Sequence, residues 1–254
     1  NTPSATDTVA DAAYPVTNTA YYKLDSNAND SSGNGYNGTA TNVTYGNGRF
    51  NEAANFNGSS SVMTIPTSTI NVGSPYTFSM WLNFTDVTAY KGIFANITSS
   101  RLTNEISVLL NNGKITIYSV NSNGNTNLDA ITATPQTSIV NNTWTNVVVI
   151  ADRSATNKAK VFFNGVEAAS YVYQASAAST AAYSNTQIGL ADGQYLDGKI
   201  DQMRIFSSAL AAGDVEDLYN EHFQTKFTDG SDTALMFTGG TGDITFLDTD
   251  PNVN

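Results

Sequence analysis

The sequence predicts an all-β protein built as an antiparallel sandwich or barrel. From Ala20 onward, short runs rich in β-branched and aromatic residues recur, such as "SSVMTIP", "YTFSMWLNF", "EISVLL" and "WTNVVVIAD". Asn, Gly and Ser turns separate these runs, and no long helical pattern lies between them. Strand-length runs at this spacing are typical of antiparallel sheets that pack or close on themselves.

The first 19 residues differ from the rest of the chain. Residues 1–19 are rich in Thr, Ala and Asp and show little periodicity, which predicts an arm or linker. The chain begins with Asn rather than Met, so we expect a processed or excised piece. The longest apolar run, "VVVIA" at 147–151, is too short to cross a bilayer, and we expect no membrane insertion.

Two hairpins are predicted from their turn residues. Asn112-Gly113 lies between "EISVLL" and "KITIYSV", and Asn164-Gly165 lies between "AKVFF" and "VEAASY". Asn-Gly readily adopts the positive φ angles that a two-residue hairpin loop needs. The flanking runs are therefore expected to pair directly with each other.

The run "YTFSMWLNF" predicts a strand with two different faces. The core face is expected to hold Tyr76, Phe78, Met80 and Leu82. The opposite face is expected to hold Thr77, Ser79, Trp81 and Asn83. That second face either lines a shallow polar groove containing Trp81 or is covered by the edge of the other sheet.

The stretch "YLDGKIDQMRIFSSALAAGDVEDLY" predicts a last central strand followed by a short helix. Its strand has the apolar members Ile200, Met203 and Ile205. Ser207 or Ser208 is expected to cap the helix. The helix has an apolar stripe that would cover an open end of the sandwich, formed by Leu210, Val215, Leu218 and Tyr219. Its acidic residues Asp214, Glu216 and Asp217 are expected to be solvated.

Composition excludes several classes of partner. The chain has 254 residues, enough for one large all-β domain or two small ones, and no cysteine, so no disulfide framework is expected. Its 11 basic and 22 acidic residues give a net charge of −11. Such a surface repels phosphate backbones and anionic lipid, so we expect no nucleic-acid binding. Many of the acids are Asp beside Asn, Ser or Gly, which suits either calcium or ordinary turns.

Three motifs in order carry a resemblance to a known family. They are "YYKLDSNANDSSGNGYNGTATNVTYGNGRFNEAANFNGSSSVMTIP", then "YTFSMWLNF" with "TWTNVVVIADRSATNKAKVFFNGVEAAS", then "GKIDQMRIFSSALAAGDVEDLY". Over 20–222 the chain resembles the laminin-G-like, concanavalin A-like jelly-roll family, in particular its bacterial and phage branch. Gln202 and Phe163 depart from the family pattern, which usually has an acidic residue and Tyr there.

The resemblance implies an antiparallel jelly-roll β-sandwich over 20–222 with one short C-terminal helix. Residues 1–19 would be an N-terminal arm, and residues 223–254 a C-terminal tail outside the family pattern. Within that tail, "TALMFTGGTGDITFLD" predicts an extra hairpin or a strand pair that seeks a partner.

A metal site is predicted in the loop "LDSNANDSSGNG" at 24–35. The loop is rich in carboxylate and amide oxygens, although an EF-hand is excluded because the terminal Glu and the flanking helices are missing. In the family, calcium commonly bridges the N-terminal hairpin and the last strand, which implies a structural calcium ion. The predicted ligands are Asp25, Asn27, Asp30, Asn34 and Asp201. Alternatively, Asp201 is a buried or edge carboxylate that accepts hydrogen bonds from backbone amides of the opening loop.

Catalytic motifs are not found. A glucanase on this scaffold would carry alternating carboxylates along one strand, and the only Glu residues near strand-like runs, Glu105 and Glu167, are far apart in sequence. The single histidine, His222, has no "GxSxG" elbow beside it and is expected to be a helix C-terminal cation. "GGTG" at 239–242 suits a hairpin turn better than a nucleotide cradle. We expect a protein that is not an enzyme.

Glycan binding would use loop-borne aromatic rings and amides. The candidate residues are Tyr90, Tyr183, Asp192, Tyr195, Trp81 and Asn83. The alternative for each is an ordinary surface or core residue.

The leading hypothesis is a non-catalytic adhesion or carbohydrate-recognition module, extracellular, on a virion (fibre or head decoration) or a bacterial surface. It would bind a cell-surface glycan or neighbouring surface proteins, and an oligomer is allowed. The second hypothesis is a purely structural decoration subunit that binds neighbours through its terminal extensions, and the third is a divergent glycoside hydrolase.

Overall fold

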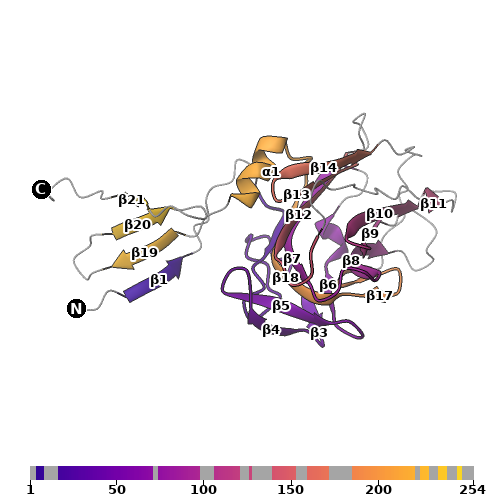
Figure 1. The fold of residues 1–254 in the computed structure, drawn as a ribbon, viewed down its shortest axis with the longest axis horizontal. Helices are drawn as coiled ribbons and strands as arrows, with labels where there is room; N and C mark the ends of the chain where they lie inside the picture. Colours follow the sequence, from indigo (N-terminus) through magenta and orange to yellow (C-terminus); the bar gives the residue numbers. More distant parts are fainter. Residues whose placement is uncertain are drawn as a thin grey trace, which may run out of the picture.

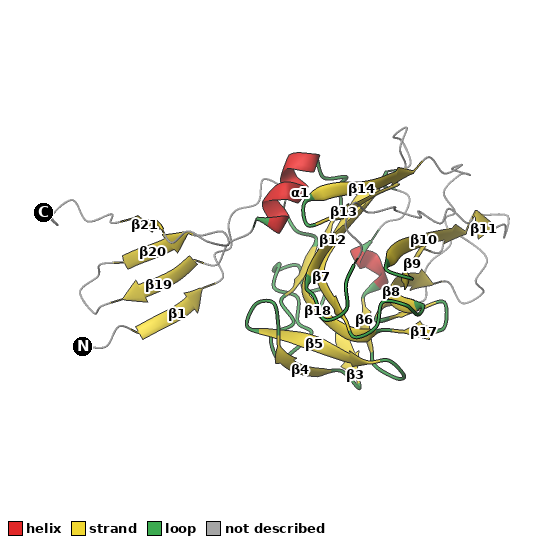
Figure 2. Cartoon of the chain, viewed as in Figure 1, coloured by secondary structure: helices red, strands yellow, loops and turns green. Residues whose placement is uncertain are grey.

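The computed structural model describes residues 4–8, 17–70, 74–97, 106–120, 126–127, 139–152, 159–171, 185–220, 224–228, 234–238 and 245–247. Two antiparallel sheets face each other in a sandwich, as the resemblance implied (Figures 1 and 2). In each sheet a strand from late in the chain lies between two early strands: β15 lies between β8 and β6, and β18 lies between β7 and β5, as in a jelly roll. The prediction of an all-β jelly-roll sandwich is confirmed.

The seven-stranded sheet has the order β11 (Thr126–Asn127), β10 (Lys114–Val120), β9 (Ile106–Asn111), β8 (Lys91–Ile97), β15 (Asn185–Ile188), β6 (Val62–Ile65) and β3 (Thr39–Thr41). The eight-stranded sheet has the order β14 (Val166–Tyr171), β13 (Ala159–Phe163), β12 (Thr145–Ala151), β7 (Tyr76–Phe84), β18 (Asp197–Phe206), β5 (Glu52–Asn57) and β4 (Thr44–Asn47), with β2 (Ala20–Tyr22) paired to β18. A 3-10 turn, η1 (Thr67–Thr69), follows β6.

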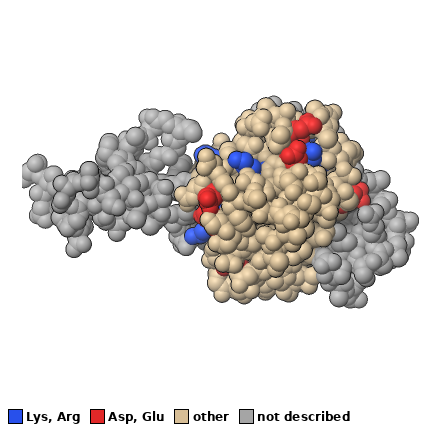
Figure 3. Space-filling model, turned by 90° about the horizontal axis from the view of Figure 1, so that it is seen from below, with Lys and Arg blue, Asp and Glu red and all other residues tan. Residues whose placement is uncertain are grey.

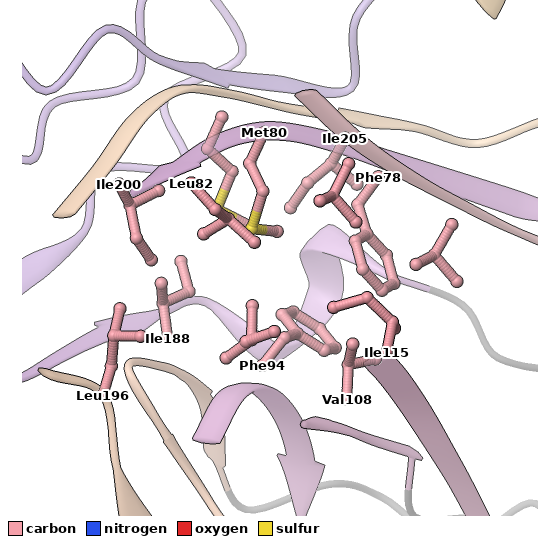
Figure 4. Packing of buried hydrophobic residues seen from close by; sticks show 14 of the residues in the cluster. Phe78, Met80, Leu82, Phe94, Val108, Ile115, Ile188, Leu196, Ile200 and Ile205 are labelled. Carbon is pink, nitrogen blue, oxygen red and sulfur yellow. The ribbon is translucent and has the colours of Figure 1, made fainter. Parts of the chain in front are cut away.

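The core lies between the two sheets. From the eight-stranded sheet, Phe78, Met80 and Leu82 of β7 point inward beside Ile200 and Ile205 of β18 (Figure 4). Opposite them lie Phe94, Val108, Ile115, Ile188 and Leu196 (Figure 4). The alternation predicted for "YTFSMWLNF" therefore holds.

Both predicted hairpins are present. Asn112 and Gly113 have φ angles of 49° and 72°, and Asn111 pairs with Lys114 across the turn. The second turn has φ angles of 49° and 80° at Asn164 and Gly165. These are the positive φ values that the Asn-Gly sequence favours.

A β-bulge interrupts β18. The register of β18 against β7 shifts between Asp201 and Arg204, and Gln202 has a φ of 49°. The extra residue explains why Ile200 and Met203, three positions apart, both lie in the core. Asp201 stays on the outer face, paired in register with Trp81.

The helix begins later than predicted. The helix α1 spans Ala212–Tyr219, and neither Ser207 nor Ser208 caps it. The Thr77 hydroxyl donates to the Ser208 carbonyl oxygen (2.8 Å) and accepts from the Leu210 N–H (3.1 Å), which holds these residues against β7 rather than in a helix. At the actual start, the Asp214 carboxylate accepts from the Ala211 N–H (3.1 Å). The apolar residues of α1 do not cover an open end of the sandwich as predicted. They pack on the outer face of the eight-stranded sheet, against Val148, Ile150, Phe162 and Phe206.

Segments near both ends of the chain pair with each other. In a separate sheet, β1 (Ser4–Thr8), β19 (Gln224–Thr228), β20 (Ala234–Thr238) and β21 (Thr245–Leu247) follow one another in that order. Thus β1, within the predicted arm, pairs antiparallel with β19 of the predicted tail.

A small hairpin lies on the outer face of the seven-stranded sheet. It consists of β16 (Leu190–Ala191) and β17 (Gln194–Tyr195). Ala191 packs with Ala95 and Leu109. A Cβ at Gly92 of β8 would lie 2.2 Å from both the Ala191 nitrogen and the Gln194 carbonyl oxygen. Only glycine lets the hairpin come this close to the sheet.

Replacing Gly92 with Ala tests this contact. Because the obstructing atoms are backbone, the hairpin must move, and we expect the free energy of unfolding to fall by about 1–3 kcal/mol. Urea denaturation measures the change. Gly213→Ala in α1 is the matched control, since no heavy atom lies within 4 Å of its Cβ position. The control is expected to be neutral or slightly stabilising, and equal losses in both variants would contradict the contact.

Candidate functional site

Asp30 is the organising carboxylate of the opening loop. Its Oδ1 accepts from the backbone N–H groups of Tyr21 and Ser32 (both 2.9 Å). Its Oδ2 accepts from the Ser32 hydroxyl and the Tyr36 N–H (both 2.9 Å). Partial burial alone would raise the pKa of Asp30, but these hydrogen bonds outweigh it and lower the pKa. Asp30 therefore holds the loop in shape with both oxygens occupied.

The two predicted amide ligands also have partners within this region. The Asn27 amide donates to the Asp25 carbonyl oxygen (3.0 Å) and accepts from the Asn29 N–H (2.9 Å). The Asn34 amide donates to the carbonyl oxygens of Asn18 (3.3 Å) and Thr19 (3.0 Å). Both side chains stabilise turns of the chain rather than converging on one point.

Asp25 and Asp201 come together instead. Asp201 is completely buried, and its Oδ2 accepts from the Phe50 N–H (2.9 Å). Burial raises the pKa of Asp201 to about 7, and the nearby Asp25 carboxylate adds to the rise, although backbone N–H groups of Phe50, Arg49 and Gln202 oppose it. Asp25 itself accepts from the Glu52 N–H (3.0 Å). The interpretation of Asp201 as a carboxylate bonded to backbone amides thus describes part of its surroundings.

The other oxygen of Asp201 has no hydrogen-bond partner although it is buried. A Cβ on Gly48 would lie 2.5 Å from the Glu52 carbonyl oxygen and 2.7 Å from Asp201 Oδ2, so these oxygens converge beside this glycine. Two carboxylates and a carbonyl oxygen are ligands of the type that calcium prefers. Among the described residues no three His, Cys, Asp or Glu residues form a metal-binding group, so carbonyl oxygens and water would complete such a site.

Trp81 and Asn83 lie on the outer face of the eight-stranded sheet. Trp81 is only 4% exposed. It packs edge-on against Phe50 and stacks on Tyr219, with both ring centroids 5.8 Å away. The Arg49 guanidinium lies 4.9 Å from the Trp81 ring centroid. Trp81 is therefore covered by a loop and a helix, not by the other sheet, and no open groove contains it.

Three other glycan candidates lie in one region, at the rim of the seven-stranded sheet. Tyr90 is 46% exposed, and its hydroxyl accepts from the Asn111 amide (2.9 Å). Tyr90 precedes Gly92, on which the β16–β17 hairpin rests. Asp192 is exposed in the turn of that hairpin, and Tyr195 is half-buried in β17. We call Tyr90, Asn111, Asp192 and Tyr195 the aromatic rim; Tyr183 lies outside the described residues.

Asn111 was not among the site residues predicted from the sequence. The predicted Asn112-Gly113 turn already placed Asn111 and Lys114 opposite each other, so it could have marked Asn111 as a surface residue beside a turn. No local signal in the sequence showed that β8 would pair with β9 and so bring Tyr90 beside Asn111.

Charges are sparse on the face shown in Figure 3, where the described surface is mainly uncharged. Within the part of the chain that the structure describes, no helix has the length and apolar content needed to span a membrane.

The raised pKa of Asp201 predicts a pH dependence in metal-free buffer. Because the folded-state pKa of about 7 exceeds the ordinary 3.8, the stabilising contribution of the proton is fully present below about pH 4 and is lost as pH rises through 7. Between these limits wild type should lose stability relative to Asp201→Asn, by about 4 kcal/mol at most. Urea unfolding at pH 4 and pH 7.5 measures both proteins. Parallel pH profiles would contradict the buried, protonated carboxyl group.

Comparison with solved structures supports the fold. Domain 4 of AbnA, an extracellular GH43 arabinanase from Geobacillus stearothermophilus solved in complex with arabinotriose, aligns with a TM-score of 0.63 and 24% identity, covering 80% of this chain and 98% of that one. The receptor-binding domain of botulinum neurotoxin C/D mosaic serotype aligns with a TM-score of 0.63 and 15% identity, covering 80% and 51%.

The binding domain of botulinum neurotoxin serotype G aligns with a TM-score of 0.59 and 16% identity, covering 80% of this chain and 50% of that one. The chain thus spans about half the length of these two toxin domains. A search among curated proteins returned no match. A family model described as the concanavalin A-like lectin/glucanases superfamily matches residues 56–216, so the chain belongs to this superfamily.

Proposed function

We propose that the protein is a non-catalytic glycan-binding module that acts outside the cell, on a virion or bacterial surface, with the aromatic rim as its sugar site. The observation that carries the proposal is the exposed Tyr90 ring, 46% accessible, whose hydroxyl is fixed by the Asn111 amide. A fixed aromatic ring offers a sugar a flat surface at little entropic cost. Asp192 and Tyr195 add polar groups on the neighbouring hairpin, as sugar hydroxyls require.

Similarity to binding domains favours this proposal. The aligned arabinanase domain was solved with arabinotriose, and the aligned C/D mosaic toxin domain is named for receptor binding. The family itself includes lectins as well as glucanases. The similarity to these domains concerns the fold. Sugar binding is inferred from the residues of the aromatic rim.

The placement of carboxylates favours binding over hydrolysis. Asp25 and Asp201 are close to each other, but Asp201 is completely buried and has no surface toward a substrate. Glu167 forms an ion pair with Lys160 (3.3 Å) in the β13–β14 hairpin. A glycosidase needs two accessible carboxyl groups on either side of the scissile bond, and neither of these arrangements supplies them.

A structural role in an assembly is a second candidate. The specific observation in its favour is the pairing of β1 with β19. This pairing joins strands from residues 1–19 and 223–254, the two segments outside the family pattern, into one sheet. Such a sheet presents strand edges to which neighbouring proteins could add. A purely structural subunit would bind no glycan through the aromatic rim.

We also propose that calcium binds between the opening loop and β18, held by Asp25, Asp201 and the Glu52 carbonyl oxygen. The unpartnered Oδ1 of Asp201 and the proximity of Asp25 support this. A cation there would neutralise two close carboxylates and stabilise the fold by binding the native state. Asp30, Asn27 and Asn34 would shape the loop around the ion.

Thermal unfolding tests the calcium site. At calcium concentrations about a hundredfold above the Kd, binding adds roughly 2.7 kcal/mol, or about 5–10 °C in Tm. Wild type should show this rise relative to chelator, and Asp201→Asn should not. Asp30→Asn is the control: it should lower Tm in both conditions but keep the calcium increment. An increment that survives in Asp201→Asn would contradict the proposed ligands.

Tyr90→Ala tests the sugar site. Loss of the stacking surface should weaken binding to a responsive oligosaccharide on a glycan array by about tenfold or more, as measured by a follow-up titration. Tyr90→Phe should keep most of the affinity because the ring remains. Tyr219→Ala, which removes a ring stacked on Trp81 at the other sheet, is the control and should bind normally. No binding by wild type to any member of the array would overturn the glycan-binding proposal.

A further inference from the structure

Resting on the proposed glycan function, we infer that the ligand is a carboxylate-bearing glycan, one containing uronic or sialic acid, and that Lys114 selects it. Lys114 begins β10, directly after the Asn112-Gly113 turn. It pairs in register with Asn111, the residue that fixes Tyr90. A cation, an amide and an aromatic ring are thus neighbours on one surface.

Lys114 and Asn111 share the outer face of the seven-stranded sheet. The residues beside them, Leu110 and Ile115, belong to the buried core. Since successive residues of a strand point to opposite faces, Asn111 and Lys114 point away from the core. Neither residue is fully buried.

The structure shows no ion pair for Lys114 among the described residues, in contrast to Lys91 and Lys160. Lys91 pairs with Asp197 (3.8 Å) and Lys160 with Glu167 (3.3 Å). Lys199 donates to the Asn47 carbonyl oxygen (2.9 Å). Lys114 is therefore available to a carboxylate from outside, at a point where a sugar stacked on Tyr90 would extend.

Acidic side chains near Tyr90 interact with other groups of the protein. Asp86 accepts from the Thr88 N–H (2.8 Å) and hydroxyl (2.7 Å), and these bonds, with a smaller contribution from Lys91, lower the pKa of Asp86. Asp192 also has an interaction within the protein. The net charge of −11 acts mainly at long range and is screened beyond about 8 Å at physiological salt. An ion pair between Lys114 and a ligand carboxylate acts over a much shorter distance, so salt weakens it less than it weakens the repulsion from the net charge.

In the binding mode that we infer, the glycan makes three contacts with the protein. The apolar face of one sugar ring stacks on Tyr90, and a sugar hydroxyl donates to the Asn111 amide oxygen, because the Asn111 amide nitrogen is used by Tyr90. The carboxylate of the same or the next sugar accepts from the Lys114 ammonium group. A neutral sugar would keep the first two contacts and lose the third.

The experiment uses the full chain and an array of matched pairs: glucuronate with glucose, galacturonate with galactose and mannuronate with mannose oligosaccharides, and sialylated with asialo glycans. Wild type should prefer at least one acidic member over its neutral partner by about fivefold, the size of an exposed ion pair. Lys114→Gln should abolish that preference and leave neutral binding unchanged. Lys199→Gln makes the same charge change on the other sheet and should keep the preference.

The outcomes separate the two proposals. If wild type binds neutral and acidic members equally, or if the preference survives Lys114→Gln, the inference about Lys114 is overturned while glycan binding through Tyr90 stands. If wild type binds no member, both are overturned. If Lys114→Gln weakens neutral binding as strongly as acidic binding, Lys114 only supports the rim structurally, and the inference is also overturned.

Discussion

The bulge in β18 is the constraint on which the other features of this sandwich depend. Gln202, held at positive φ, lets Met203 return to the core after Ile200 and keeps Asp201 on the outer face. Because Asp201 is outside the core but fully buried, something must cover it. The loop carrying Arg49 and Phe50 does so, and its backbone N–H groups satisfy one oxygen of the carboxylate.

That cover gives the two sheets different outer faces. On the eight-stranded sheet, Phe50, Tyr219 and α1 bury Trp81 and the apolar residues beyond it. On the seven-stranded sheet, the small β16–β17 hairpin covers Gly92, Ala95 and Leu109, and Tyr90 stays exposed beside it. The outer face of the eight-stranded sheet is thus largely covered, whereas the seven-stranded sheet has the exposed Tyr90 ring beside its hairpin.

Local signals in the sequence were sufficient for the hairpins and the core face of β7, because Asn-Gly turns and strict alternation act over a few residues. Local signals were insufficient where residues far apart in the sequence determine the structure. The start of α1 is set by Thr77, 133 residues before Leu210 in the chain. Asp30 and Asp201 look equally suited to a metal in the sequence. In the structure, four donors from Tyr21, Ser32 and Tyr36 saturate Asp30, whereas Asp201 keeps an unpartnered oxygen. Asn111 lies beside Tyr90 because β8 pairs with β9, a contact between strands that local turn signals do not specify.

The β16–β17 hairpin has a consequence for how such a protein can diverge. It touches the sheet through Gly92 and Ala191, while Asp192 and Gly193 at its tip project from the surface, and no heavy atom lies within 4 Å of the Cβ position of Gly193. A side chain at the tip therefore meets no core residue, but Asp192 and Gly193 have φ angles of 49° and 73°, which few residue types adopt without strain. The tip can therefore vary among residues that accept a positive φ, such as Asn, Asp and Gly, while the packed interior of the sandwich stays unchanged. Under the proposed function, such variation would change the ligand.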